Sequence, residues 1–214
     1  MSAERQWWLR VPAVFLSPRS VFVALREEEQ EDVEARQEPV LMLVFLAGIA
    51  AALATPTART LYDDGEYDGA LVAVWAFFAG GLTAVAGYFI IGGALYLGAR
   101  GLGGLGTYKR SRHLLGFAAA PLALSLLLLW PLELALFGGD RFGRGGSDDG
   151  AAGSAFSALE LGFGAWSAGL LLVGVRAVHG WSWWRSLGAL GLLALFLAAF
   201  VYYPSVVDRL FEER

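Results

Sequence analysis

Two carboxylates lie at the edges of apolar stretches, where an ionisable side chain is a candidate for chemistry. Glu133 follows the uncharged run Leu114–Leu132, and Glu160 immediately precedes the uncharged run Leu161–Val175. A charge inside a membrane is costly, so such a residue is a functional hypothesis by default. At 1.5 Å per residue, Glu133 lies roughly 29 Å along its helical segment, near the boundary from which Glu160 starts. We expect both carboxylates on one side of a membrane. They either share a shallow outer vestibule that binds a cation or relays a proton, or lie at headgroup level in water.

Other kinds of site are not predicted. The chain has no cysteine and two histidines, so thiolate and histidine-rich metal sites are excluded. No HExxH, GxSxG or cysteine-based pattern is present, so we predict no catalytic, cofactor-binding or metal-binding residue and no enzyme. Gly101–Gly106 matches a dinucleotide fingerprint in its letters, but it follows an apolar run instead of a strand, which favours a hinge. The formal charge of −4 argues against nucleic-acid binding.

Five long runs without a charged residue must position these side chains. A helix crosses the hydrocarbon core with about 20 mostly apolar residues, and a backbone without water must be helical there. The sequence therefore predicts an all-α fold, a polytopic membrane bundle of five transmembrane helices within residues 39–207. The longest run is expected to be one tilted helix, and Pro121 and Pro131 to kink the third span. The runs are Pro39–Ala58, Gly69–Ala99, Leu114–Leu132, Leu161–Val175 and Ser186–Val207, and the approximate spans are 39–58, 70–99, 114–137, 157–178 and 186–207.

The loops between these runs differ in basic residues, which predicts an orientation. Eleven of the sixteen lysines and arginines lie in the N-terminal segment and in the second and fourth loops. By the positive-inside rule, the N-terminus is cytoplasmic and the C-terminus, with a short tail over 208–214, is external. The first apolar run begins near residue 39, so we expect an anchor and no secretory signal. Abundant Ala and Gly, with Lys109 as the single lysine, are typical of a GC-rich prokaryote, which places the protein in the plasma membrane.

Residues 1–38 are predicted to form a cytoplasmic amphipathic helical segment. Ser17 and Pro18 form a helix-start signal, an N-cap hydroxyl followed by proline at the first helical position. Phe22 and Leu25 then share one apolar face, followed by an acidic linker over 27–34. Such a helix either lies in the membrane interface or docks a partner.

The external loop Gly138–Ala155 is rich in Gly, Ser and Asp, so we expect flexible decoration there.

A cationic segment follows the glycine loop. Thr107 is expected to cap a helix that carries Tyr108, Lys109, Arg110 and Arg112, side chains that suit the anionic cytoplasmic leaflet. Small residues also recur at a spacing of four, which allows helices to approach closely, either within one chain or in a homo-oligomer. These pairs are Gly80 with Ala84, Ala94 with Gly98, and Gly164 with Ala168.

Five segments follow one another along the chain, namely Ser17–Phe22, Glu38–Pro39, Gly103–Arg110, Gly116–Pro121 and His179–Leu187. In this order they resemble the Yip (Ypt/Rab-interacting protein, Yip-one type) domain family of integral membrane proteins. The glycine-rich Gly103–Arg110 and the following Gly116–Pro121 resemble the family's cytoplasmic loop and its entry into the third helix. Ser17–Phe22, Glu38–Pro39 and His179–Leu187 resemble its amphipathic helix, its first-span entry and its last loop. The resemblance covers nearly the whole chain and implies five helices with the N-terminus inside. Three tryptophans in the last loop depart from the usual pattern.

The resemblance implies a non-enzymatic membrane scaffold or adaptor. It would engage a membrane or cytoplasmic protein, or anionic lipid, through its cytoplasmic face, and a homo-oligomer is compatible with it. Eukaryotic members are associated with Rab-type GTPases, a function that does not transfer to a prokaryotic sequence. The alternative is a small transporter, or the membrane component of one, with Glu133 and Glu160 in an outer cavity. Five helices cannot form equal inverted repeats, so that reading needs a dimer or a partner.

Overall fold

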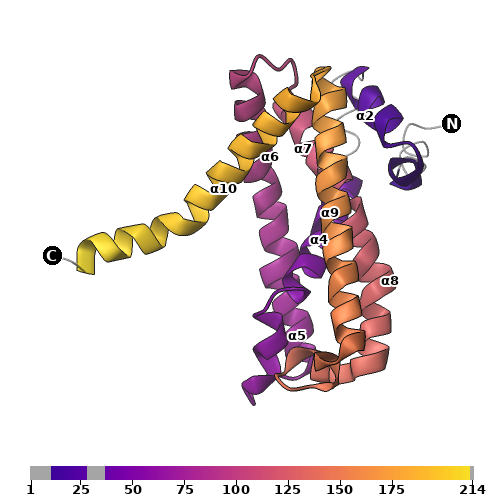
Figure 1. Cartoon of the computed structure of the whole chain (residues 1–214), viewed down its shortest axis with the longest axis vertical. Helices are drawn as coiled ribbons and strands as arrows, with labels where there is room; N and C mark the ends of the chain where they lie inside the picture. The colour runs from indigo at the N-terminus through magenta and orange to yellow at the C-terminus, as the bar shows by residue number, and fades with distance from the viewer. Residues whose placement is uncertain (1–10, 28–36, 213–214) are drawn as a thin grey trace.

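The computed structural model describes residues 11–27 and 37–212, with side chains described for 11–26 and 40–199. Within these ranges the chain is helical and contains no β-strand, as predicted (Figure 1). Of the predicted amphipathic segment, residues 1–10 and the acidic linker from residue 28 onward lie outside the described residues, whereas residues 11–16 are helical. The elements are α2 (Pro18–Glu27), α4 (Gln37–Leu53), η1 (Ala58–Asp63), α5 (Gly69–Trp75), η2 (Ala76–Leu82), α6 (Thr83–Gly101), α7 (Tyr108–Ala118), α8 (Ala120–Phe137), η3 (Gly138–Phe142), η4 (Ser147–Asp149), α9 (Ala151–His179) and α10 (Trp183–Glu212).

Three helical stretches in the described part of the chain are long and apolar enough to cross a membrane. They are Gly69–Gly101, Tyr108–Phe142 and Ala151–His179, with 33, 35 and 29 residues. The first confirms the prediction of one long helix, which contains a π-helical segment at η2. Two shorter apolar helices, Val40–Leu53 and Trp183–Ala199, accompany them. The first uncharged run is therefore not helical throughout, because α4 ends at Leu53.

The long helices pack side by side, and the bundle has two distinct ends. We call the upper end in Figure 1 the α7 end, where α2, the start of α7 and the α9–α10 turn lie together. We call the lower end the η3 end, where η1, η3 and η4 meet the ends of α8 and α9. α10 contacts α6 and α9 near the α7 end and then departs from the bundle (Figure 1).

Small residues allow α4 to cross η2 and α6 at close range. A Cβ atom built at Gly48 would overlap the side chain of Ala84 and lie 2.5 Å from the carbonyl oxygen of Gly80. A Cβ at Gly80 would lie 2.6 Å from the carbonyl oxygen of Gly48. The predicted Gly80–Ala84 pair therefore serves packing within the chain. Gly164, in contrast, has no neighbouring atom within 4 Å of its Cβ position.

Proline and threonine set the boundaries of the third apolar segment. α7 ends one residue before the turn at Ala119, and α8 begins with Pro121 in its first turn, where no N–H is required. Pro131 lies inside α8. Thr107 caps α7 as predicted, its hydroxyl accepting from the backbone N–H of Arg110 at 3.3 Å.

Candidate functional site

The two carboxylates singled out in the sequence meet on one arginine at the η3 end. Arg141 lies in η3, Glu133 on α8 and Glu160 on α9. The Arg141 Nε donates to Glu133 Oε2 at 2.6 Å, and its Nη2 donates to Glu160 Oε1 at 3.0 Å. The exposed fractions of the three side chains are 2%, 0% and 9%. A planar guanidinium suits this arrangement, because its fork presents fixed donors to two oxygen acceptors at once.

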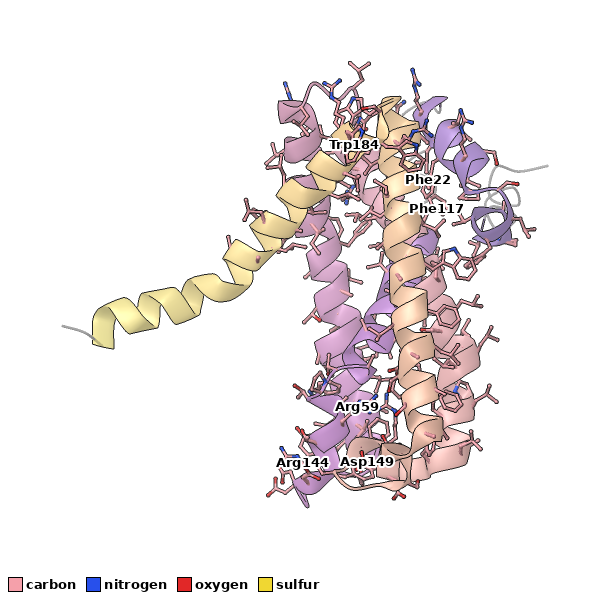
Figure 2. All side chains as sticks on the ribbon, in the orientation of Figure 1. Phe22, Arg59, Phe117, Arg144, Asp149 and Trp184 are labelled. Atoms are coloured by element: carbon pink, nitrogen blue, oxygen red, sulfur yellow. The ribbon has the colours of Figure 1, made fainter. Side chains whose placement is uncertain are left out.

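Two further charged residues complete this ion cluster. Arg59 of η1 donates to Ser157 Oγ at 2.7 Å and lies 3.8 Å from Glu160 Oε2. Asp148 Oδ2 of η4 lies 3.6 Å from Arg59 Nη1 and 3.9 Å from Arg141 Nη1. Arg59 lies inside the lower part of the bundle, whereas Arg144 is at its edge (Figure 2). We refer to these five residues, namely Arg59, Glu133, Arg141, Asp148 and Glu160, as the ion cluster.

Aromatic rings wall the cluster on one side. The Arg141 guanidinium lies 5.1 Å from the ring centroid of Trp130, and the Phe142 ring is nearly parallel to that indole, with centroids 6.4 Å apart.

Three carboxylates of the ion cluster face two guanidiniums, which leaves one excess negative charge when all are ionised. Glu133 Oε1 and Asp148 Oδ1 are buried and have no hydrogen-bond partner. The charges of the ion cluster are desolvated, so each one is stabilised mainly by its oppositely charged neighbours.

The structure brings Glu133 and Glu160 together on Arg141, and both carboxylates are buried in the bundle. The expectation that Gly138–Ala155 is flexible decoration is wrong, because this loop buries Arg141 and Asp148 in the bundle. Sequence reasoning also missed Arg59. Nothing in the spacing of these residues indicates pairing. The one usable signal was that Arg59 and Arg141 follow the first and third apolar runs, on the side where the two carboxylates were expected.

A different arrangement of arginine occurs at the α7 end. The Arg112 guanidinium lies 4.7 Å from the ring centroids of both Phe89 and Tyr108, and 5.5 Å from that of Tyr88. Arg112 is 5% exposed, and its Nε has no hydrogen-bond partner. A side chain at Gly92 would overlap the Arg112 stem, so a glycine is needed there. Arg112 is thus enclosed by aromatic rings and does not project as part of an open basic patch.

The other predicted contact residues differ in accessibility. Tyr108 is exposed, and its hydroxyl donates to the carbonyl oxygen of Phe89 at 3.0 Å. Lys109 and Arg110 are half-buried and engaged in interactions of their own. Phe22 and Leu25 are 0% and 1% exposed, because α2 packs against α9 and α7. A partner would reach these two side chains only if α2 left the bundle.

The glycine loop and the α9–α10 turn pack on each other. A Cβ at Gly106 would lie 2.8 Å from His179 Cε1, and Gly103 has φ +76°, a conformation that favours glycine. The His179 ring stacks on Trp181 with centroids 4.6 Å apart. Arg185 lies over Trp181 and donates to the carbonyl oxygen of Leu102. The loop is therefore a close-packed junction, not an open hinge.

The junction joins the two loops whose residues resemble the Yip pattern. The sequence model of the Yip1 domain family matches residues 13–203. The chain belongs to the Yip1 domain family. This membership, together with the apolar helices, makes it a membrane protein. Comparison with curated proteins and with solved structures gives no match. The Yip1 match includes both ends of the bundle, and thus the ion cluster and the arginines at the α7 end.

Within residues 11–27 and 37–212, no group of three or more His, Cys, Asp or Glu side chains is arranged to hold a metal ion. In the ion cluster, the carboxylates face arginines, which compete with any cation for the same oxygen atoms.

Proposed function

We propose that this Yip1 domain protein is a non-enzymatic scaffold or adaptor in the plasma membrane of a prokaryote. It crosses the bilayer five times, with α4 and α10 as the additional spans. The α7 end faces the cytoplasm and binds partner proteins or anionic lipid. The three long apolar helices, the two shorter ones and the distribution of basic residues support this topology.

One observation carries the proposal: arginines at the α7 end face aromatic rings instead of carboxylates. Arg112, Arg176 and Arg185 each lie within 4.7 Å of a ring centroid. None of them forms an ion pair with a described carboxylate. A ring orients a guanidinium without neutralising it, so this end keeps positive charge for an anionic lipid or an acidic protein surface.

Site-specific photocrosslinking in native membranes tests the scaffold. Leu105 and Trp184, both 84% exposed, lie at the α7 end, and Leu161, 75% exposed on α9, is the matched control. A photoreactive residue at Leu105 or Trp184 should give discrete protein adducts, and one at Leu161 should give lipid adducts only. Identical products at all three positions would contradict a partner-binding α7 end.

The topology has a separate test, because the chain contains no native cysteine. A membrane-impermeant maleimide added to intact cells should label Ser147→Cys, at the η3 end, but not Leu105→Cys. The reverse labelling pattern would show that the orientation is inverted.

The alternative function is a small transporter that uses the ion cluster. The specific observation in its favour is the excess negative charge, with buried oxygens of Glu133 and Asp148 lacking partners. A proton or a small cation would neutralise it, and a homodimer or a partner would complete a pathway. The test compares flux in proteoliposomes for the wild type and the Glu133→Gln/Glu160→Gln double variant. Equal flux would remove the transport hypothesis.

A further inference from the structure

A pocket at the α7 end gathers three arginines from two elements. The cavity has a volume of about 200 Å³ and lies between α2 and the end of α9. Arg19 and Arg26 enter it from α2, and Arg176 enters from α9. Gly180 and Trp181, in the α9–α10 turn, form another wall. Among the residues that the structure describes, none of those that line the cavity is acidic.

The three guanidiniums have no anionic partner among the described residues. No ion pair within the described part of the chain involves Arg19, Arg26 or Arg176. The Arg176 Nε is buried without a hydrogen-bond partner, and its guanidinium lies 4.5 Å from the ring centroid of Trp183. Stacking holds the plane of this guanidinium and leaves its N–H groups for an oxygen ligand. Like charges in so small a volume repel each other, so an anion between them would be favourable.

Gly180 gives Arg26 access to the turn. Its φ of +66° is the left-handed conformation that ends α9, and glycine adopts it without strain. A Cβ at this position would lie only 3.3 Å from Arg26 Nη1. Arg26 therefore extends from α2 to the α9–α10 turn, and the pocket joins the amphipathic helix to the bundle.

We propose that this pocket binds the phosphate group of an anionic phospholipid. The inference rests on the proposed function, in which the α7 end lies at the cytoplasmic interface. Guanidinium forks match the oxygens of a phosphate, and three of them favour a headgroup with net negative charge. A lipid supplies this phosphate, because Val23, Val173 and Ala177 also line the pocket and suit the apolar part of a lipid. The bound headgroup bridges α2 and α9 and so holds the amphipathic helix on the bundle.

Native mass spectrometry of the full-length protein, titrated with phosphatidylglycerol in neutral detergent, measures this binding. Replacing Arg176 or Arg26 by Gln should weaken the first bound lipid about tenfold each, the loss of one charge-assisted hydrogen bond. Arg176→Lys keeps the charge but loses the guanidinium fork, so its affinity for the first bound lipid should lie between those of Arg176→Gln and the wild type. Arg100→Gln is the matched control, because Arg100 is exposed at the same end and donates to Tyr96 Oη. Equal losses for Arg100→Gln and Arg176→Gln would overturn a defined pocket.

Two further experiments on the wild-type protein decide whether the phosphate comes from a phospholipid or from free inorganic phosphate. Hydrogen exchange in α2 should slow in nanodiscs that contain phosphatidylglycerol, compared with phosphatidylcholine alone. No difference between these nanodiscs would overturn the proposal. Millimolar inorganic phosphate should neither displace the lipid nor slow exchange, and full displacement would assign the pocket to soluble phosphate instead. These readouts are independent of the crosslinks at Leu105 and Trp184, so a failed lipid site and a failed scaffold are distinguishable.

Discussion

Replacing Arg141 by Met is expected to destabilise the protein strongly. The change removes the guanidinium that lies 2.6 Å from Glu133 and 3.0 Å from Glu160. Glu133, whose side chain has no exposed surface, then loses the one cation that pairs with it among the described residues. Asp148 retains Arg59 at 3.6 Å, and Glu160 retains Arg59 at 3.8 Å, a longer distance than the 3.0 Å to Arg141.

The burial of these groups sets the magnitude. Removing one partner of a buried ion pair typically costs 3–5 kcal/mol, because the remaining charge stays desolvated. The side chains of Glu133, Arg141 and Glu160 are all less than 10% exposed, so solvent screening reduces this cost little. We therefore expect the free energy of unfolding to fall by about 3–5 kcal/mol, a large part of the 5–15 kcal/mol typical of a folded protein.

Arg144→Met is the matched control, since Arg144 follows in the same loop and pairs with Asp63 at 3.2 Å. The side chain of Arg144 is 80% exposed. An exposed pair contributes about 0–1 kcal/mol, so this variant should be nearly neutral. Unfolding is measured by titrating SDS into lipid bicelles and following tryptophan fluorescence, for which Trp130 reports beside the cluster.

A second variant separates a lost ion pair from a lost side chain. Combining Arg141→Met with Glu133→Met removes both partners, so it should recover about 2 kcal/mol relative to Arg141→Met alone. If Arg141→Met and Arg144→Met agree within about 1 kcal/mol, the description of the cluster as a desolvated network is refuted.

Three other substitutions follow from local geometry. Gly48→Ala should lower the free energy of unfolding by about 1–3 kcal/mol, because the added methyl group forces α4 away from η2. Gly164→Ala has no atom near the added methyl group, so in the same SDS titration it should leave this free energy unchanged or raise it by up to about 1 kcal/mol. Asp68 accepts from the backbone N–H of Leu71 at 2.8 Å at the start of α5, so Asp68→Ala should cost about 0.5–2 kcal/mol and increase hydrogen exchange in the first turn of α5. Arg112→Met retains most of the apolar stem between the rings, so it should lower stability less than Arg141→Met does; an equal loss would show that Arg112 has an anionic partner.

Local signals in the sequence were sufficient for much of the fold. Pro18 and Thr107 mark helix starts in the structure because the chemistry of these starts involves only neighbouring residues. The absence of charge over Gly69–Ala99 predicted one long helix for the same reason. The length of α4 was overestimated, since absence of charge does not report where a helix ends; α4 stops at Leu53, and a turn follows before η1.

The ion cluster could be predicted only in part, because it depends on tertiary contacts. The positions of Glu133 and Glu160 along their helices predicted that both lie at the same end of the bundle. This prediction needs only the helical rise per residue. Arg59 and Asp148 lie 89 residues apart in sequence, and their pairing depends on how η1 and η4 pack. Composition indicated a flexible loop over Gly138–Ala155, but this segment contains η3, η4 and the start of α9, and it buries Arg141 and Asp148.

The two ends of the bundle use the same side chain for different purposes, and loop composition does not distinguish them. At the η3 end, Arg59 and Arg141 are engaged by carboxylates, so an incoming anion would have to replace partners that are already bound. At the α7 end, Arg112 and Arg176 lie against aromatic rings, which orient the guanidinium but carry no formal charge to cancel it. The charge available to a ligand is therefore greater at the α7 end than a count of arginines alone would indicate. In the orientation that we propose, the anionic surface of the cytoplasmic leaflet attracts this end. In the proposed function, positive charge at the α7 end serves both membrane insertion and recognition, whereas the ion cluster at the η3 end joins η1, η3 and η4 to α8 and α9.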